Sequence, residues 1–146
     1  KILKANPNNA GALNYLGYML ADRNVRLTEA LEMIQKAVEK DPGNGAYLDS
    51  LGWVYFRLDR LKDAETQLLA AIEKVSTDPT VHDHLGDVYA KQGKLKDAVD
   101  QWQASLRQWK QSAPAEQDAT EVAKVQKKLD SAKVRMAKEG SNAKKP

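Results

Sequence analysis

The side chains best suited to chemistry in this sequence lie close together between residues 82 and 87. His82, Asp83 and His84 are consecutive, and Asp87 follows four residues after Asp83. Imidazole and carboxylate groups are the usual ligands of a bound metal ion. On a helix, however, His82 and His84 would project roughly 200° apart, so they could not hold one ion together. The chain has no further His and no Cys, and we therefore expect no metal site.

The same carboxylates lack the surroundings that acid–base catalysis requires. Asp83 and Asp87 would share one helical face, but that face is expected to be open to water. A catalytic carboxyl group needs a desolvated pocket that shifts its pKa. The sequence also contains no G-x-S-x-G, no H-E-x-x-H and no Gly-rich phosphate loop. We therefore expect no catalytic residues, no cofactor and no enzymatic activity.

Three similar segments organise the chain, and each contains Leu-Gly followed by an aromatic or apolar helix face. Their glycines, Gly17, Gly52 and Gly86, are 35 and then 34 residues apart. Each segment is followed by a turn and by a second helix with a small, a large and a small residue at fixed spacing: Ala30, Ile34 and Ala37, then Ala64, Leu68 and Ala71, then Ala98, Trp102 and Ser105. The pattern predicts a helix–turn–helix unit that occurs three times.

This pattern, with its period of about 34 residues, resembles the tetratricopeptide repeat. The resemblance covers residues 1–111 and implies an all-α superhelix, a solenoid of about three helical hairpins. We place the hairpins at residues 8–41, 42–77 and 78–111, with residues 1–7 as the end of a preceding repeat helix. Pro79 comes three residues later than the pattern requires, so we expect the second helix of the middle repeat to be longer by about a turn.

The repeated glycines predict close contact between the two helices of each hairpin. A Gly inside a helix costs about 0.5–1 kcal/mol relative to Ala, so a packing advantage must offset it three times. We expect the large residue of each second helix to pack on the Gly of the first. The hairpin boundaries also carry signals: Asp78-Pro79 is a good helix start, and Gly93 suits a left-handed turn residue.

The segment after Ser112-Ala113-Pro114 has a different pattern. A single helix is predicted from about Ala115 to Lys138, with one apolar stripe: Val122, Val125, Leu129, Ala132 and Met136. We interpret residues 112–139 as a capping helix that covers repeat three near Trp102, Leu106 and Trp109, because a repeat stack needs such a cap. A coiled-coil dimer through the same stripe is the alternative. Residues 140–146 are expected to be a disordered basic tail.

The net charge of +3 is unevenly distributed, which bears on the class of partner. Residues 124–146 hold eight Lys/Arg and two Asp/Glu, a net of +6, whereas the remainder has a net of −3. The C-terminal cations, among them Lys124, Lys127 and Lys128, alternate with the apolar stripe and are expected to form the solvated face of the capping helix. Aromatic residues are not interleaved with them, so we expect no nucleic-acid binding. No apolar run reaches the ~20 residues of a membrane span, so no membrane insertion is expected.

The first helices of stacked repeats line a concave groove, and the outward residues of those helices are the candidate binding residues. Helical spacing selects Asn14, Tyr15, Tyr18 and Asp22 in repeat one, Asp49, Ser50, Trp53, Phe56 and Arg57 in repeat two, and Asp83, His84, Asp87 and Lys91 in repeat three. In the resembled family, residues at such places commonly contact peptides. The groove is aromatic and acidic, so we predict a partner segment with apolar side chains and some positive charge.

Two functional hypotheses follow from these observations. The first is a protein-interaction scaffold that holds a partner protein or peptide in the groove. The alternative is the structural end of a longer solenoid that mediates self-association, and in that case the aromatics would pack against neighbouring repeats. The chain begins at Lys1 without Met, which suggests a fragment of a longer protein, and it resembles bacterial proteins with long repeat arrays. The compartment stays open: the bacterial cytoplasm, or the periplasm and outer membrane if a signal lies upstream.

Overall fold

The computed structural model describes residues 9–143, with the side chains of residues 9–115 and 117–140. Every regular element within that range is helical, as the sequence predicts. The chain divides into two compact units: unit 1 comprises residues 1–76 and unit 2 residues 77–146. The predicted repeat helix over residues 1–7 lies outside the described residues.

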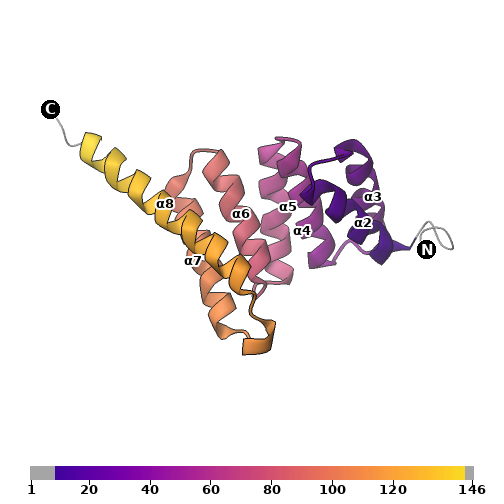
Figure 1. Cartoon of the computed structure of the whole chain (residues 1–146). Helices are drawn as coiled ribbons and strands as arrows, with labels where there is room; N and C mark the ends of the chain where they lie inside the picture. The colour runs from indigo at the N-terminus through magenta and orange to yellow at the C-terminus, as the bar shows by residue number, and fades with distance from the viewer. Residues whose placement is uncertain (1–8, 144–146) are drawn as a thin grey trace. The chain divides into compact units, whose positions relative to one another are not determined.

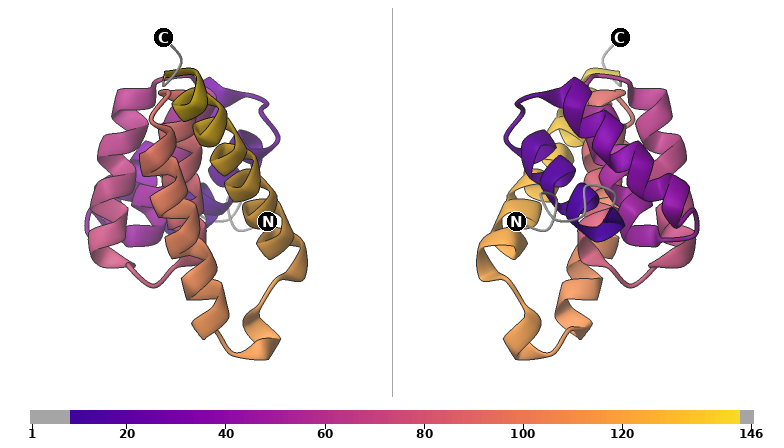
Figure 2. Two further views of the ribbon diagram at one scale, coloured as in Figure 1. Left: turned by 90° about the vertical axis from the view of Figure 1, so that its left-hand side faces the viewer. Right: turned by 90° about the vertical axis from the view of Figure 1, so that its right-hand side faces the viewer.

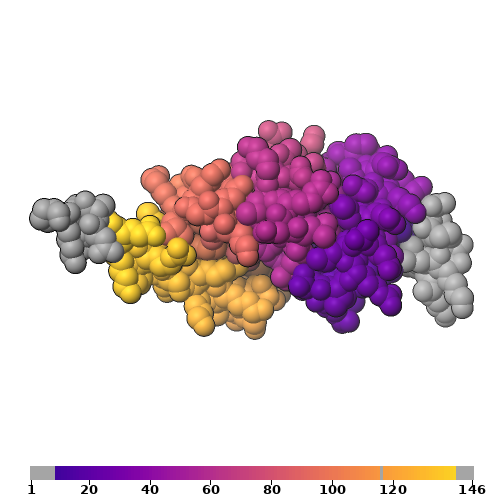
Figure 3. Space-filling view, turned by 90° about the horizontal axis from the view of Figure 1, so that it is seen from above, coloured from indigo at the N-terminus to yellow at the C-terminus, as the bar shows by residue number. Residues whose placement is uncertain are grey.

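Unit 1 contains two antiparallel hairpins (Figure 1). The first pairs α2 (Ala10–Asp22) with α3 (Leu27–Lys40), and the second pairs α4 (Gly45–Arg57) with α5 (Leu61–Lys74). Helix α4 also packs against both α2 and α3, so the two hairpins stack on one another. In the space-filling view their surfaces meet directly (Figure 3).

Unit 2 contains the third hairpin, α6 (Pro79–Lys91) with α7 (Leu95–Gln111), then a short 3-10 turn, η1 (Pro114–Glu116), and α8 (Ala119–Ala143). Helix α8 packs along α7 (Figure 2). It begins later than the predicted Ala115, because the carboxylate of Asp118 accepts hydrogen bonds from the backbone N–H groups of Thr120 (3.0 Å) and Glu121 (3.1 Å). It also continues past the predicted end at Lys138, so the expectation of disorder was wrong for residues 140–143. Residues 144–146 lie outside the described residues.

Side-chain caps set where the first helix of each hairpin begins. Asn9, Asn44 and Asp78 accept hydrogen bonds from the backbone N–H groups of Ala12 (2.8 Å), Tyr47 (3.1 Å) and Thr80 (2.9 Å). Asp78 therefore caps α6 as predicted, with Pro79 at the first helical position. The prediction of a longer second helix in the middle repeat was wrong: α5 and α3 both have 14 residues. Pro79 starts the next helix instead of marking a delayed turn.

A left-handed residue turns the chain inside each hairpin. Gly93 has φ 81°, which confirms the prediction for that position. Asn24 and Asp59, at the corresponding places of the first two hairpins, have φ 58° and 62°. Asn and Asp tolerate this conformation better than most residues, which suits them to these turn positions. The first turn differs from the other two, because it has one more residue before its second helix and a second left-handed residue, Arg26, with φ 49°.

The predicted approach at the three glycines is confirmed. A β-carbon placed on Gly17 would lie 2.7 Å from Ile34 Cγ1, and one placed on Gly52 would lie 2.6 Å from Leu68 Cγ. At Gly86 the same added atom would overlap the indole of Trp102. The small residues Ala30, Ala64 and Ala98 are fully buried on the opposing helices. The residue pairs that hold each hairpin together are thus the pairs that the spacing predicted.

Candidate protein-binding site

The aromatic residues predicted in repeat two form a packed layer in unit 1. The rings of Trp53 and Phe56 are stacked, with centroids 4.9 Å apart and planes inclined by 17°. The guanidinium group of Arg57 lies 4.9 Å from the centroid of the Trp53 ring, within the range of a cation–π contact. Trp53 is only 6% exposed, so it belongs to the core more than to an open groove. Tyr18 packs against the same cluster.

Asp22 joins this layer to α2. The indole Nε1–H of Trp53 donates to Asp22 Oδ1 at 3.3 Å, and the guanidinium of Arg57 donates to the backbone carbonyl of Asp22 at 2.9 Å. Arg57 also lies 3.8 Å from the Asp22 carboxylate. Four of the predicted groove residues, Asp22, Trp53, Phe56 and Arg57, therefore meet in space and fix one another's positions.

Replacing Asp22 with Ala is expected to destabilise unit 1 by about 1 kcal/mol, because it removes the part-buried hydrogen bond that the carboxylate accepts from the indole N–H of Trp53. The matched control is Glu32→Ala, which removes an exposed carboxylate from α3 in the same unit and should change stability by less than about 0.5 kcal/mol. Urea unfolding followed by tryptophan fluorescence would measure both. Equal midpoints for the two variants would show that the hydrogen bond contributes nothing.

The other predicted residues of unit 1 differ in their exposure. Tyr15 is 68% exposed on α2, whereas Asn14 is half-buried. Asp49 and Ser50 were expected on the groove surface, but the structure buries both. The physical reason is that α4 packs against α2, α3 and α5, which leaves little of its circumference for a partner.

In unit 2 the predicted acidic residues already have a partner within the chain. Lys128 Nζ, on α8, donates to Asp83 Oδ1 at 2.5 Å and to Asp87 Oδ1 at 2.8 Å. Lys128 was expected on the solvated face of the capping helix, but its side chain is only 32% exposed. Among the described residues, Lys128 is thus the ion-pair partner of both Asp83 and Asp87. Helix α8 therefore occupies this part of the face on which a guest segment was predicted.

Burial and charge shift the pKa values of this cluster. Burial raises the pKa of Asp87, and the negative charge of the neighbouring Asp83 raises it further. Together these two effects outweigh the opposing effect of Lys128. Burial alone would lower the pKa of Lys128, but Asp87 and Asp83 together overcome it and raise that pKa. The ammonium group is therefore held in its charged form, between two carboxylates of which Asp87 ionises less readily than usual.

The histidines of repeat three take structural places. His82 Nδ1 lies 2.9 Å from Gln101 Oε1, a contact between α6 and α7 that agrees with the expectation of packing inside the repeat. His84 is 5% exposed, and Lys91 is exposed. Within the described part of the chain, no three His, Cys, Asp or Glu side chains converge as metal ligands would.

The apolar stripe of α8 packs inside its own chain. Val125, Leu129 and Ala132 are buried with Trp102, and Leu106 and Met136 flank them. The other expected neighbour, Trp109, lines a shallow cleft of about 240 Å³ with Leu106 and Val122. A stripe that is buried in this way is not available for a coiled-coil dimer.

Family comparison agrees with this architecture. The family model described as tetratricopeptide repeat matches residues 1–45 and 26–79, which together make up more than half of the chain. The chain belongs to the tetratricopeptide repeat (TPR) family. A bacterial relative, TPR repeat-containing protein PA4667 of Pseudomonas aeruginosa, is 50% identical over 64 residues, or 44% of this chain. The match spans only 11% of that relative's length.

Solved structures with the same TPR fold include complexes with bound partners. PcrH in complex with the chaperone binding region of PopD has a TM-score of 0.75 at 17% identity, over 86% of this chain and 92% of that chain. A type III secretion complex from Aeromonas hydrophila gives 0.76 at 16% identity, over 94% and 91%. The TPR protein TTC0263 of Thermus thermophilus gives 0.71 at 21% identity, over 91% and 68%. At these identities the likeness is one of fold alone.

The sequence did not predict that Lys128 contacts the α6 face on which Asp83 and Asp87 lie. Lys128 follows Val125 by three residues and precedes Leu129, so helical spacing places it beside the buried stripe. That position was the available signal for partial burial of the side chain, but it does not identify the helix that Lys128 reaches: the stripe packs mainly on α7, whereas Asp83 and Asp87 lie on α6. As for the membrane, none of the helices within residues 9–143 combines the length and the apolar character that a crossing requires.

Proposed function

We propose that this TPR chain is a protein-interaction module that holds a segment of a partner protein on the α2/α4 face of unit 1. The observation that carries the proposal is the exposure of Tyr15, at 68%, on the helix that the Trp53 layer anchors through Asp22. An exposed aromatic side chain on a rigid support is the usual form of an interface hot spot. The proposal assigns no catalytic role to any residue.

The supporting layer explains why such a face could bind without rearranging. Trp53, Phe56 and Arg57 are ordered by their mutual contacts and by two hydrogen bonds to Asp22. A surface that is already ordered loses little conformational entropy when a partner arrives. Apolar side chains of the partner would pack on Tyr15 and Tyr18, and a Lys or Arg would meet the carboxylate of Asp22, whose side chain is 57% exposed.

The comparisons add support without supplying a partner. PcrH, which shares the fold, was solved with the chaperone binding region of PopD, so this fold can hold a segment of another protein. The side chains of Asp83 and Asp87 are paired with Lys128 and only 13% and 17% exposed, whereas that of Asp22 is largely exposed. We therefore place the partner on unit 1 and not on that part of unit 2.

Replacing Tyr15 with Ala is expected to reduce partner recovery in a pull-down from the source bacterium about tenfold, because it removes the exposed anchor. Its folded-state stability should stay within about 0.5 kcal/mol of the original, because the side chain is exposed. Leu69→Ala is the matched control, since Leu69 is an apolar residue 43% exposed on α5. Equal loss with both variants, or loss with the control alone, would refute the assignment to the α2/α4 face.

A further inference from the structure

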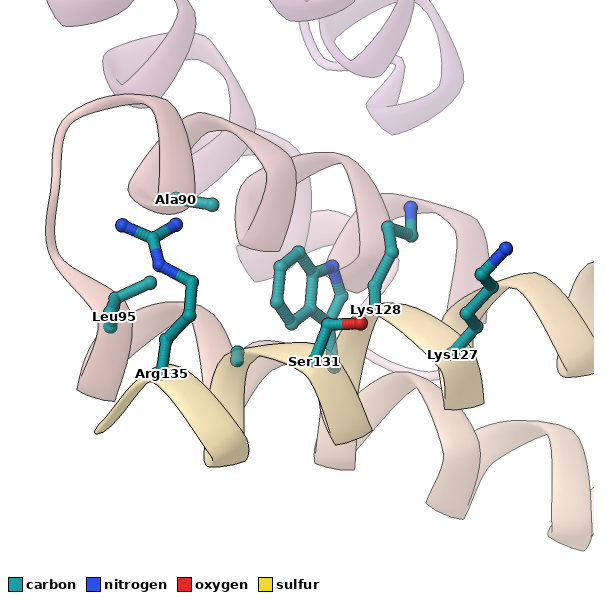
Figure 4. A pocket seen from close by; sticks show the side chains of 8 residues that line it. Ala90, Leu95, Lys127, Lys128, Ser131 and Arg135 are labelled. Atoms are coloured by element: carbon teal, nitrogen blue, oxygen red, sulfur yellow. The ribbon is translucent and has the colours of Figure 1, made fainter. Parts of the chain in front are cut away.

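A second surface with a different character lies within unit 2, where α8 crosses the end of α6 and the start of α7. A cleft of about 270 Å³ opens there (Figure 4). Its apolar wall includes Ala90, Leu95 and Trp102, and its outer edge is made of α8 residues, among them Lys127, Ser131 and Arg135. Trp102 is only 4% exposed, so its ring does not form a flat aromatic surface open to solvent. The apolar part of the cleft, lined by Ala90, Leu95 and Trp102, is here called the socket.

The charge around this cleft is positive and partly uncompensated. None of the described residues that line it is acidic. The charge of Lys128 is balanced by Asp83 and Asp87. Lys127 and Arg135, in contrast, make no ion pair with any residue that the structure describes. Figure 4 shows Arg135 at one end of the cleft, beside Leu95, and Lys127 at the other. An apolar socket thus lies between two available cations.

We propose that this cleft docks an acidic segment of a partner polypeptide, with one apolar side chain in the socket and carboxylates on either side of it. Lys127 and Arg135 are eight residues apart on α8, which corresponds to about 12 Å along the helix. One terminal carboxylate would not reach both cations, whereas Asp or Glu residues on both sides of an apolar residue would. The required partner chemistry is thus opposite in charge to that of the α2/α4 face, and the two proposals stand independently.

A phosphate backbone is the other polyanion that two cations could attract. Binding of single-stranded nucleic acid relies on aromatic side chains whose faces are open to stacking bases. Trp102 offers no such face, because it is almost fully buried. The socket also favours an apolar side chain over a ribose or a phosphate, so the structure favours the acidic polypeptide.

The test is an NMR titration of the ¹⁵N-labelled 146-residue chain with the acetylated, amidated peptide Gly-Glu-Glu-Leu-Glu-Glu-Gly at concentrations up to millimolar. The expected shifts are at the indole Nε1–H of Trp102 and at amides of residues 127–135, with the indole of Trp53 unchanged. A peptide with Ser in place of Leu should bind at least fivefold more weakly. Ser131→Trp, which fills the mouth of the cleft, should abolish the shifts.

A matched pair of charge variants separates the cleft from general attraction to a basic helix. The double variant Lys127→Glu/Arg135→Glu should weaken binding at least tenfold. The control, Lys124→Glu/Lys133→Glu, makes the same change in net charge away from the cleft. It should weaken binding less than threefold. Equal loss in both pairs, no shift at Trp102, or unchanged binding by Ser131→Trp would overturn the proposal. Tighter binding of a thymidine dodecamer with the same Lys127 and Arg135 dependence would overturn it in favour of nucleic acid.

Discussion

Replacing Gly52 with Ala is expected to destabilise unit 1 by about 2 kcal/mol. The added β-carbon would lie 2.6 Å from Leu68 Cγ and 3.3 Å from the backbone carbonyl oxygen of Ala64. The backbone of α5 cannot yield as a flexible side chain can, so the two helices must separate. Overpacking of this kind costs about 1–3 kcal/mol, which exceeds the 0.5–1 kcal/mol that Ala gains over Gly in a helix. Urea unfolding would measure the difference.

Gly11→Ala is the matched control, because a β-carbon at Gly11 would make only ordinary contacts, at 3.5 and 3.8 Å. That variant should be neutral or more stable by up to about 1 kcal/mol. Combining Gly52→Ala with Leu68→Ala should cost less than the sum of the two single changes, since the second removes the group with which the first collides. If the two losses in unfolding free energy simply add in the double variant, or if Gly52→Ala is more stable than the original chain, close approach at Gly52 does not hold the hairpin together.

Replacing Lys128 with Met is expected to destabilise unit 2 by about 2 kcal/mol, because it leaves Asp83 and Asp87 side by side without their cation. Breaking a buried pair costs about 3–5 kcal/mol and an exposed one about 0–1 kcal/mol; the 32% exposure of Lys128 places this cluster between them. Lys127→Met removes an equal charge from a residue that forms no ion pair within the described part of the chain, and it should have little effect. Native-state hydrogen exchange of α6 and α8 would measure both.

The pH dependence of that cluster has a defined sign. The pKa of Lys128 is raised above 10.5, so its contribution is complete below that pH and is lost as the pH rises through the raised value. The pKa of Asp87 is raised above 3.8, so protonating it favours the folded state. Lys128→Met should therefore recover part of its lost stability as the pH falls below neutral. A variant that loses further stability on mild acidification would contradict the assigned cluster.

The architecture of this chain was predictable from sequence because its determinants are short-range. The spacing of Gly52, Ala64 and Leu68 specifies a close helix pair whatever lies further along the chain. The start of α8 was missed although Asp118, three residues before Glu121, is a recognisable helix-start signal. The predicted start at Ala115 follows the change of pattern at Pro114 directly, whereas Pro114–Glu116 form a 3-10 turn before α8 begins.

The candidate site was less predictable, because helical spacing shows which residues share a face but not how much of that face a neighbour covers. Trp53 and Asp49 had the right spacing for the groove, yet packing of α4 against three helices buries them. The pairing of Lys128 with Asp83 and Asp87 depends on how α8 is aligned against α6. Residues 45 positions apart in the chain determine that alignment, and no local pattern encodes it.

The most direct test of binding on the α2/α4 face is hydrogen–deuterium exchange of the full chain, with and without the protein recovered in the Tyr15-dependent pull-down. If the partner binds there, α2 and α4, residues 10–22 and 45–57, gain protection from exchange, and exchange in α3 stays unchanged. Protection confined to α3 and α5, or to unit 2 with α2 and α4 unaffected, would contradict it.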